Sequence, residues 1–143
     1  MSRSMLPEVA GGCLCGAIRY RIAAKPLSVA CCHCSKCRRA SGAALVAWAT
    51  FPKRALQVVG HPKRRKSSPL AERFFCAECG TQLFFAYVTG PATVDVTLGS
   101  LDDPNALQPS YALWSGDKPT WLREACTLPE HADNGPDYTP YHR

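Results

Sequence analysis

Apolar and polar residues alternate along many short stretches of the chain, and this pattern predicts β-strands. In residues 17–23, two isoleucines and a tyrosine fall on one face and two arginines on the other, which is the period of a half-buried strand. Glycine, proline and aspartate separate further short apolar runs. The predicted strands cover residues 17–23, 27–31, 43–51, 55–59, 72–75, 80–87, 93–99, 111–114 and 120–122. We therefore expect a mostly β fold built from short antiparallel sheets.

One helical turn and several irregular stretches complete the predicted elements. The composition of residues 35–41 favours a helical turn, which Gly42 ends. Residues 61–69, HPKRRKSSP, predict a basic loop, and the stretches before Glu8 and after Pro129 show no periodicity. The length fits one domain over residues 1–143, with a core of about residues 11–125 and an irregular tail at 126–143.

The composition places the chain among globular proteins with an unusual number of cysteines. Hydrophobic residues make up 46% and charged residues 20%, an ordinary balance. The first ten residues contain no apolar run of the kind found in signal peptides, and no segment reaches the roughly 18 apolar residues of a membrane span. We therefore expect a cytoplasmic protein without a membrane partner. In that reducing compartment, nine cysteines are more typical of metal binding or catalysis than of disulfides.

Four of the cysteines form a complete set of ligands for a structural metal ion. Cys13 and Cys15 make a C-x-C motif between glycines, and Cys76 and Cys79 make a C-x-x-C motif at the tip of a predicted hairpin. Structural zinc normally has four protein ligands, and sulfur ligands favour zinc, or less readily iron, over Mg²⁺ and Ca²⁺. Two disulfides are the alternative.

Three further cysteines, Cys32, Cys34 and Cys37, form a C-x-C-x-x-C motif. A catalytic zinc ion usually has three protein ligands and an open position for water or substrate, so we predict these three as catalytic ligands of a second zinc ion. The alternative is a closed structural site with a fourth ligand from His33, His61 or Cys31. An extended chain would turn His33 away from its neighbours.

Basic residues near the second motif suggest an acidic small ligand. Arg38 and Arg39 follow Cys37 directly and can hold a substrate carboxylate; neutralising the thiolates is the alternative. The run KRRK at residues 63–66 can bind a nucleic-acid backbone or face solvent. Seven thiolates and two zinc ions lower the formal charge of +6 to about +3, which argues against nucleic acid.

The two remaining cysteines, Cys31 and Cys126, are expected to be small buried hydrophobic residues. For Cys31, a redox role together with Cys32 is an alternative.

The motifs GGCLCGAIRY, CCHCSKCRRASGA, RFFCAECGTQLFF and VTLGSLDDP, followed by Trp121, resemble the glutathione-dependent formaldehyde-activating enzyme family, also called the centromere protein V family. The resemblance covers residues 11–121. It implies a β-tent-like fold, a structural zinc ion on Cys13, Cys15, Cys76 and Cys79, and a catalytic-type zinc ion on Cys32, Cys34 and Cys37. The implied activity joins glutathione and formaldehyde to S-hydroxymethylglutathione, which makes such proteins carbon–sulfur lyases.

The first functional hypothesis is therefore a zinc-dependent carbon–sulfur lyase. Its partners would be a glutathione-like thiol and an aldehyde such as formaldehyde, with the three-cysteine zinc as the reactive centre. The family usually has a histidine where this chain has Tyr111, so Tyr111, His61 and His131 are the candidates for the general acid or base. The alternative is a non-catalytic binding module, held together by zinc, whose basic face binds nucleic acid or an acidic protein.

Overall fold

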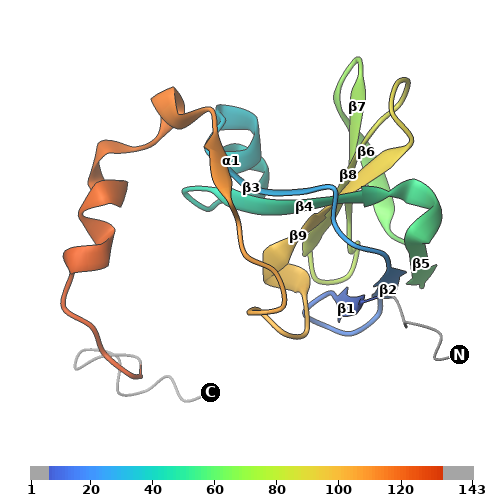
Figure 1. Ribbon diagram of the computed structural model, residues 1–143, viewed down its shortest axis with the longest axis horizontal. Coiled ribbons are helices and arrows are strands. Elements are labelled where there is room, and N and C mark those ends of the chain that lie inside the picture. The colour runs from blue at the N-terminus through green and yellow to red at the C-terminus, as the bar shows by residue number, and fades with distance from the viewer. Residues whose placement is uncertain (1–6, 134–143) are drawn as a thin grey trace, which may run out of the picture.

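The computed structural model describes residues 7–133, and most of its elements are strands (Figure 1). A three-stranded antiparallel sheet has the order β1 (Glu8–Gly12), β2 (Arg19–Ala23), β5 (Leu56–Val59). A seven-stranded sheet has the order β10 (Tyr111–Leu113), β3 (Ser28–Cys32), β4 (Val46–Pro52), β9 (Thr93–Thr97), β8 (Gln82–Tyr87), β7 (Ala71–Phe75), β6 (Lys63–Ser68). Its pairings are antiparallel except β10 with β3. The mostly β prediction is confirmed.

The helical elements are short. They are α1 (Ser35–Ser41) and the 3-10 helices η1 (Lys53–Ala55), η2 (Leu98–Ser100), η3 (Ser115–Asp117), η4 (Thr120–Arg123) and η5 (Ala125–Thr127). Within residues 7–133, none has the length and apolarity that crossing a bilayer requires. The helical turn predicted at residues 35–41 is confirmed. It ends at Gly42, whose left-handed φ of 69° suits glycine.

Apolar side chains from both sheets form one core. Tyr20 and Ile22 of β2 pack with Phe51 of β4 and Val94 and Val96 of β9, and Tyr20 and Phe51 are 1% and 0% exposed. The alternation predicted for residues 17–23 is therefore the pattern that this core buries. The Tyr20 hydroxyl lies 2.6 Å from Ser100 Oγ, so the buried phenol has a polar partner.

The first strand was not predicted, because EVAGG has no clear alternation. It forms because β1 hydrogen-bonds to β2 along its whole length, and Gly11 also bridges to Leu101. A Cβ atom on Gly11 would collide with the Ser100 carbonyl oxygen and with Tyr20. Glycine is therefore required for this close approach of two backbones.

Two local predictions are wrong. Residues 61–69 do not form a loop, because Lys63–Ser68 pair with β7 as the edge strand β6; lysine and arginine are well suited to a sheet edge that faces solvent. Residues 120–122 do not form a strand. Among residues 7–133 no strand pairs with this segment, and its backbone bonds locally, with the Leu122 N–H donating to the Pro119 carbonyl at 3.1 Å, which gives η4.

The C-terminal part of the described chain leaves the body of the molecule (Figure 1). Cys126 in η5 is exposed, so its predicted burial is wrong: this segment packs against no core. Cys31 is half-buried on β3 and belongs neither to this core nor to the small buried cluster around Trp48 and Val46. Residues 134–143 of the predicted irregular tail lie outside the described residues.

The face of the seven-stranded sheet that points away from the core carries the chemistry. Because side chains alternate along a strand, Ala30 shares this face with its partner Trp48, and Thr50 shares it with its partner Asp95. Phe85 lies opposite Asp95 on the next strand. The following sections concern this face and the helix α1 at its end.

Candidate metal centres

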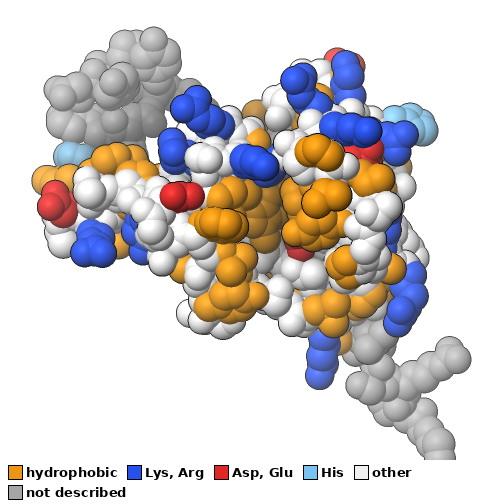
Figure 2. Space-filling model, turned by 90° about the horizontal axis from the view of Figure 1, so that it is seen from above, with side chains coloured by type: hydrophobic (Ala, Val, Ile, Leu, Met, Phe, Trp, Pro, Cys, Tyr) orange, Lys and Arg blue, Asp and Glu red, His pale blue; other side chains and the backbone are white. Residues whose placement is uncertain are grey.

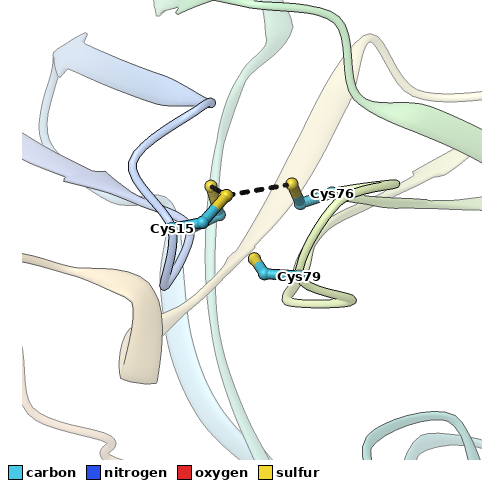
Figure 3. A group of neighbouring side chains, drawn as sticks. Cys15, Cys76 and Cys79 are labelled. Carbon is cyan, nitrogen blue, oxygen red and sulfur yellow. Dashed lines mark hydrogen bonds between the residues drawn. The ribbon is translucent and has the colours of Figure 1, made fainter.

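Four thiols meet between the β1–β2 loop and the β7–β8 hairpin. Cys13 and Cys15 lie on the loop, and Cys76 and Cys79 lie on the hairpin turn, where their side chains face Cys15 (Figure 3). All four sulfur atoms lie within 4.8 Å of one another. The Sγ atoms of Cys13 and Cys15 are 3.6 Å apart, and those of Cys15 and Cys76 are 3.8 Å apart.

These separations fit a metal ion. Four sulfurs held at about 2.3 Å from a tetrahedral ion lie about 3.8 Å from one another, whereas a disulfide bond is about 2 Å long. All nine cysteines are free thiols, so the structure does not support the disulfide alternative. This four-thiol cluster can hold a metal ion.

Hydrogen bonds favour ionisation of Cys79 and Cys13, whereas at Cys15 the Ala17 backbone lowers the pKa but the neighbouring thiols and burial raise it overall to about 12. The Thr81 hydroxyl lies 3.2 Å from Cys79 Sγ; with the Thr81 backbone, it lowers the pKa of Cys79 to about 5, which favours the thiolate form. The Ile18 N–H donates to Cys13 Sγ at 3.2 Å. Thiolates are the form of cysteine that binds metals.

The second group, the three-thiol cluster, forms where β3 runs into α1. Cys32 ends β3, Cys34 is the N-cap of α1, and Cys37 lies in its first turn. Cys34 Sγ accepts a hydrogen bond of 3.3 Å from the Cys37 N–H, so the helix cap fixes the spacing of these sulfurs. All three Sγ atoms lie within 4.8 Å of one another.

No fourth ligand completes the three-thiol cluster among the histidine, cysteine, aspartate and glutamate side chains in residues 7–133. His33 is buried, yet it does not join the group, in agreement with its predicted orientation. His61 is exposed and Cys31 does not join the group either. The cluster is a three-ligand arrangement.

The electrostatics of the three-thiol cluster favour a bound cation. Burial raises the pKa of Cys32 to about 12. Burial also opposes ionisation of Cys34, but hydrogen bonds from the Cys37 backbone and the neighbouring thiols lower its pKa overall. Three thiolates so close together repel one another, and a soft cation removes this repulsion. Arg73 supplies one positive charge, with Nη2 3.6 Å from Cys37 Sγ.

A cavity of about 490 Å³ opens onto the three-thiol cluster; we call it the thiol cavity. Its size is that of a small-molecule site. Its lining includes all three thiols, the apolar rings of Trp48 and Phe85, and polar side chains of neighbouring strands. In Figure 2, apolar side chains flank a hollow in the molecular surface, and lysine and arginine side chains gather near one end of it.

Asp95 is a cavity residue that sequence reasoning missed. Its carboxylate accepts a hydrogen bond of 2.5 Å from the Thr50 hydroxyl, and Ser28 Oγ donates to Thr50 at 3.1 Å. Burial raises the pKa of Asp95, although the Thr50 hydrogen bond opposes this. The signal was the sequence TVDVT: with both valines in the core, the aspartate between them must face the other way.

Sequence reasoning also missed Arg73. Of the residues it predicted for proton transfer and substrate binding, the structure brings only one to the thiol cavity. Tyr111 lines the thiol cavity, whereas His61 and His131 are exposed and are not part of its lining. Arg38 is half-buried on α1, and Arg39 is exposed beside it. Neither arginine lines the thiol cavity.

Known proteins resemble this chain in family, in sequence and in fold. The family model described as "Glutathione-dependent formaldehyde-activating enzyme" matches residues 8–117. A Schizosaccharomyces pombe protein named as an uncharacterized lyase is 36% identical over 85 residues, which are 59% of this chain and 62% of that protein. The match thus spans less than two thirds of this relative. A crystal structure of a Rhodobacter sphaeroides protein is 25% identical, with a TM-score of 0.55 over 73% of this chain and 99% of that one.

Proposed function

Because the chain belongs to the glutathione-dependent formaldehyde-activating enzyme family, we propose that it is a carbon–sulfur lyase. The proposed reaction joins a glutathione-like thiol to an aldehyde such as formaldehyde, or cleaves the adduct. One observation carries the proposal: three thiols without a fourth described ligand open onto a cavity large enough for a small molecule.

Zinc is the ion we assign to both clusters. Sulfur ligands favour it, the sulfur separations of the four-thiol cluster fit its bond lengths, and a three-ligand arrangement is typical of catalytic zinc. When bound to the three-thiol cluster, zinc supplies an open Lewis-acid position that lowers the pKa of a substrate thiol. We propose Cys32, Cys34 and Cys37 as its ligands.

The reaction is an addition without any change of oxidation state. The thiol sulfur forms a bond to the carbonyl carbon, the C=O double bond becomes a single bond, and the proton lost from the thiol ends on the new hydroxyl oxygen. The cleavage reverses each of these changes. The chain must therefore bind two small molecules together and provide a path for one proton.

Residues of the thiol cavity fit these needs. Trp48 and Phe85 form an apolar wall that limits water near the thiols. Asp95, held by Thr50, is a carboxyl group of the lining whose pKa is raised by burial, which suits it to take up or release a proton during the reaction. Arg73 lies against both Cys37 and the Phe85 ring, 5.3 Å from the ring centre, and places a positive charge beside the sulfurs.

The four-thiol cluster has a different role in this proposal. We assign Cys13, Cys15, Cys76 and Cys79 to a structural zinc ion that fastens the β1–β2 loop to the β7–β8 hairpin. With four sulfur ligands the ion has no open position for substrate.

The test uses cobalt and zinc forms of the protein. Addition of glutathione to the cobalt form should strengthen the sulfur-to-cobalt charge-transfer absorption, since a fourth sulfur joins the three-thiol cluster. In the zinc form, NMR exchange should show faster interconversion of glutathione plus formaldehyde with S-hydroxymethylglutathione. Cys34→Ser should lose both effects, and Cys126→Ser, at an exposed cysteine outside both clusters, should keep them. A cobalt spectrum that glutathione leaves unchanged, together with uncatalysed exchange, would refute the proposal.

A further inference from the structure

A second hollow adjoins the thiol cavity, and basic side chains line it. This basic groove has a volume of about 620 Å³, and α1, β6, β7 and the start of β8 form its walls. Its basic residues are Lys36, Arg39, Arg65, Lys66 and Arg73. No aspartate or glutamate is among the described residues that line it.

The strand register places two of these cations against each other. Arg65 of β6 lies directly opposite Arg73 of β7, and like charges in such a pair destabilise a sheet. The adjacent acid, Glu72, is one residue along β7 and so points to the other face, where it lies 3.8 Å from Arg64. Lys66, which also lines the groove, lies opposite Glu72, but the register gives the Arg65–Arg73 pair no acidic partner, and a conflict of this kind is expected at functional sites.

Some buried polar atoms of the described groove residues have no hydrogen-bond partner. Among the described residues, Arg73 Nη1 and both polar atoms of the Gln82 side chain are buried without a hydrogen bond, which is costly unless a ligand satisfies them. The other nitrogens of Arg73 are held: Nε donates to Ser67 Oγ at 2.8 Å, and Nη2 donates to Cys37 Sγ at 3.6 Å. The guanidinium is therefore fixed with one donor free.

We propose that the basic groove binds the anionic end of the thiol substrate, and that it selects thiols carrying two or more negative charges as carboxylate or phosphate groups. Even without Lys66, which lies opposite Glu72, four cations line the groove, more than a single charge would need. Arginine pairs with both kinds of oxyanion through two parallel hydrogen bonds. Arg73 lines both hollows and touches Cys37, so a short molecule spans the distance. That the ligand is a thiol rests on the proposed function. That the groove binds an anion is argued from the groove residues and does not depend on that function.

The first experiment measures anion binding without any reaction. Calorimetry of the zinc-loaded protein with methylthiosuccinate, a dicarboxylate whose sulfur is blocked, and separately with inorganic phosphate, should show saturable binding of one or both that weakens with salt. The stronger ligand identifies the oxyanion class. Arg65→Gln and Arg39→Gln should each weaken binding about tenfold. Arg21→Gln removes the same charge from the exposed face of β2 and should leave the affinity unchanged.

Two further readouts separate a binding role from a structural one. Arg65→Gln removes a like-charge contact, so its thermal midpoint should equal or exceed that of the parent while its affinity falls. In the aldehyde addition, mercaptosuccinate should have a lower KM than neutral 2-mercaptoethanol, and Arg65→Gln should reduce that advantage about tenfold.

The outcomes are distinguishable. If 2-mercaptoethanol reacts but neither anion binds, the inference is overturned and the proposed function stands. If the anions bind and no thiol reacts, the proposed function fails and the groove stands as an anion site. If Arg21→Gln weakened anion binding as much as Arg65→Gln does, the inference would be overturned. The anions would then be attracted by the overall positive charge of the protein and not by the groove. Binding of a single-stranded oligonucleotide that neither small anion displaces would overturn it as well.

Discussion

The two thiol clusters should respond differently to the loss of one sulfur, and Cys76→Ser against Cys34→Ser is the comparison that tests this. Cys76 is 1% exposed, and its cluster joins segments that are 61 residues apart at Cys15 and Cys76. The unfolded chain has no such site, so the metal affinity contributes to folding, by on the order of 10 kcal/mol for structural zinc. The net stability of a domain is about 5–15 kcal/mol. Losing the site should therefore leave Cys76→Ser largely unfolded.

Cys34→Ser should behave in the opposite way. Serine is a good N-cap, and its hydroxyl can replace the thiol that accepts the Cys37 N–H. The fold around α1 should therefore survive with a loss of about 1–2 kcal/mol, as for an ordinary substitution. Metal content should fall from about two ions per chain to about one, because a cluster of two thiols binds zinc weakly.

The assay is urea denaturation followed by far-ultraviolet circular dichroism, with metal content measured by atomic emission on the same samples. Cys126→Ser is the matched control, because Cys126 is exposed and belongs to neither cluster. Equal losses of stability in Cys76→Ser and Cys34→Ser would refute the division into a structural and a reactive metal. So would a Cys76→Ser protein with the midpoint of the parent.

Three other predictions follow from single features. Asp95→Asn should raise the thermal midpoint near pH 8 and slow turnover. The raised pKa of Asp95 means that ionisation costs stability as pH rises through it, so the gain should shrink as pH falls toward the ordinary aspartate pKa of about 4; a constant or opposite difference would contradict this cause. Gly11→Ala should cost about 1–3 kcal/mol in urea denaturation through its backbone collision, whereas Gly99→Ala, where an added methyl group meets no atom within 4 Å, serves as the tolerant control. In the zinc-loaded protein, a thiol reagent followed by mass spectrometry should modify Cys126 first, and earlier labelling of the cluster thiols would argue against metal protection.

The thiol clusters could be predicted from the sequence because metal ligands have characteristic spacings. Cys32, Cys34 and Cys37 come together through a strand end and one helical turn, both of which are local structures. Pairing of Cys13 and Cys15 with a distant C-x-x-C motif followed from the need for four ligands. The structure brings together both predicted groups.

The residues around the thiols could not be predicted, because they depend on strand register. Asp95 reaches the thiol cavity through the pairing of two strands that are distant in sequence, with Thr50 opposite Asp95. Arg73 lies opposite Phe85 within the β7–β8 hairpin, where a shift of one residue in register would turn its side chain to the other face. Local composition also predicted a loop where β6 forms. A charged segment becomes a strand when the edge of a neighbouring strand, here β7, supplies backbone hydrogen bonds. Near the C-terminus the opposite holds: η4 has strand-like residues but no neighbouring edge.

The wide sequence separation within the four-thiol cluster has a consequence for biosynthesis. Cys13 and Cys15 leave the ribosome long before Cys79, so the nascent chain carries these two oxidisable sulfurs without their partners until the β7–β8 hairpin has been made. Metal loading at this cluster is accordingly a late event in translation. Under the proposed zinc assignment, chains made without the ion would lack the link between the β1–β2 loop and the β7–β8 hairpin and would remain open to proteases.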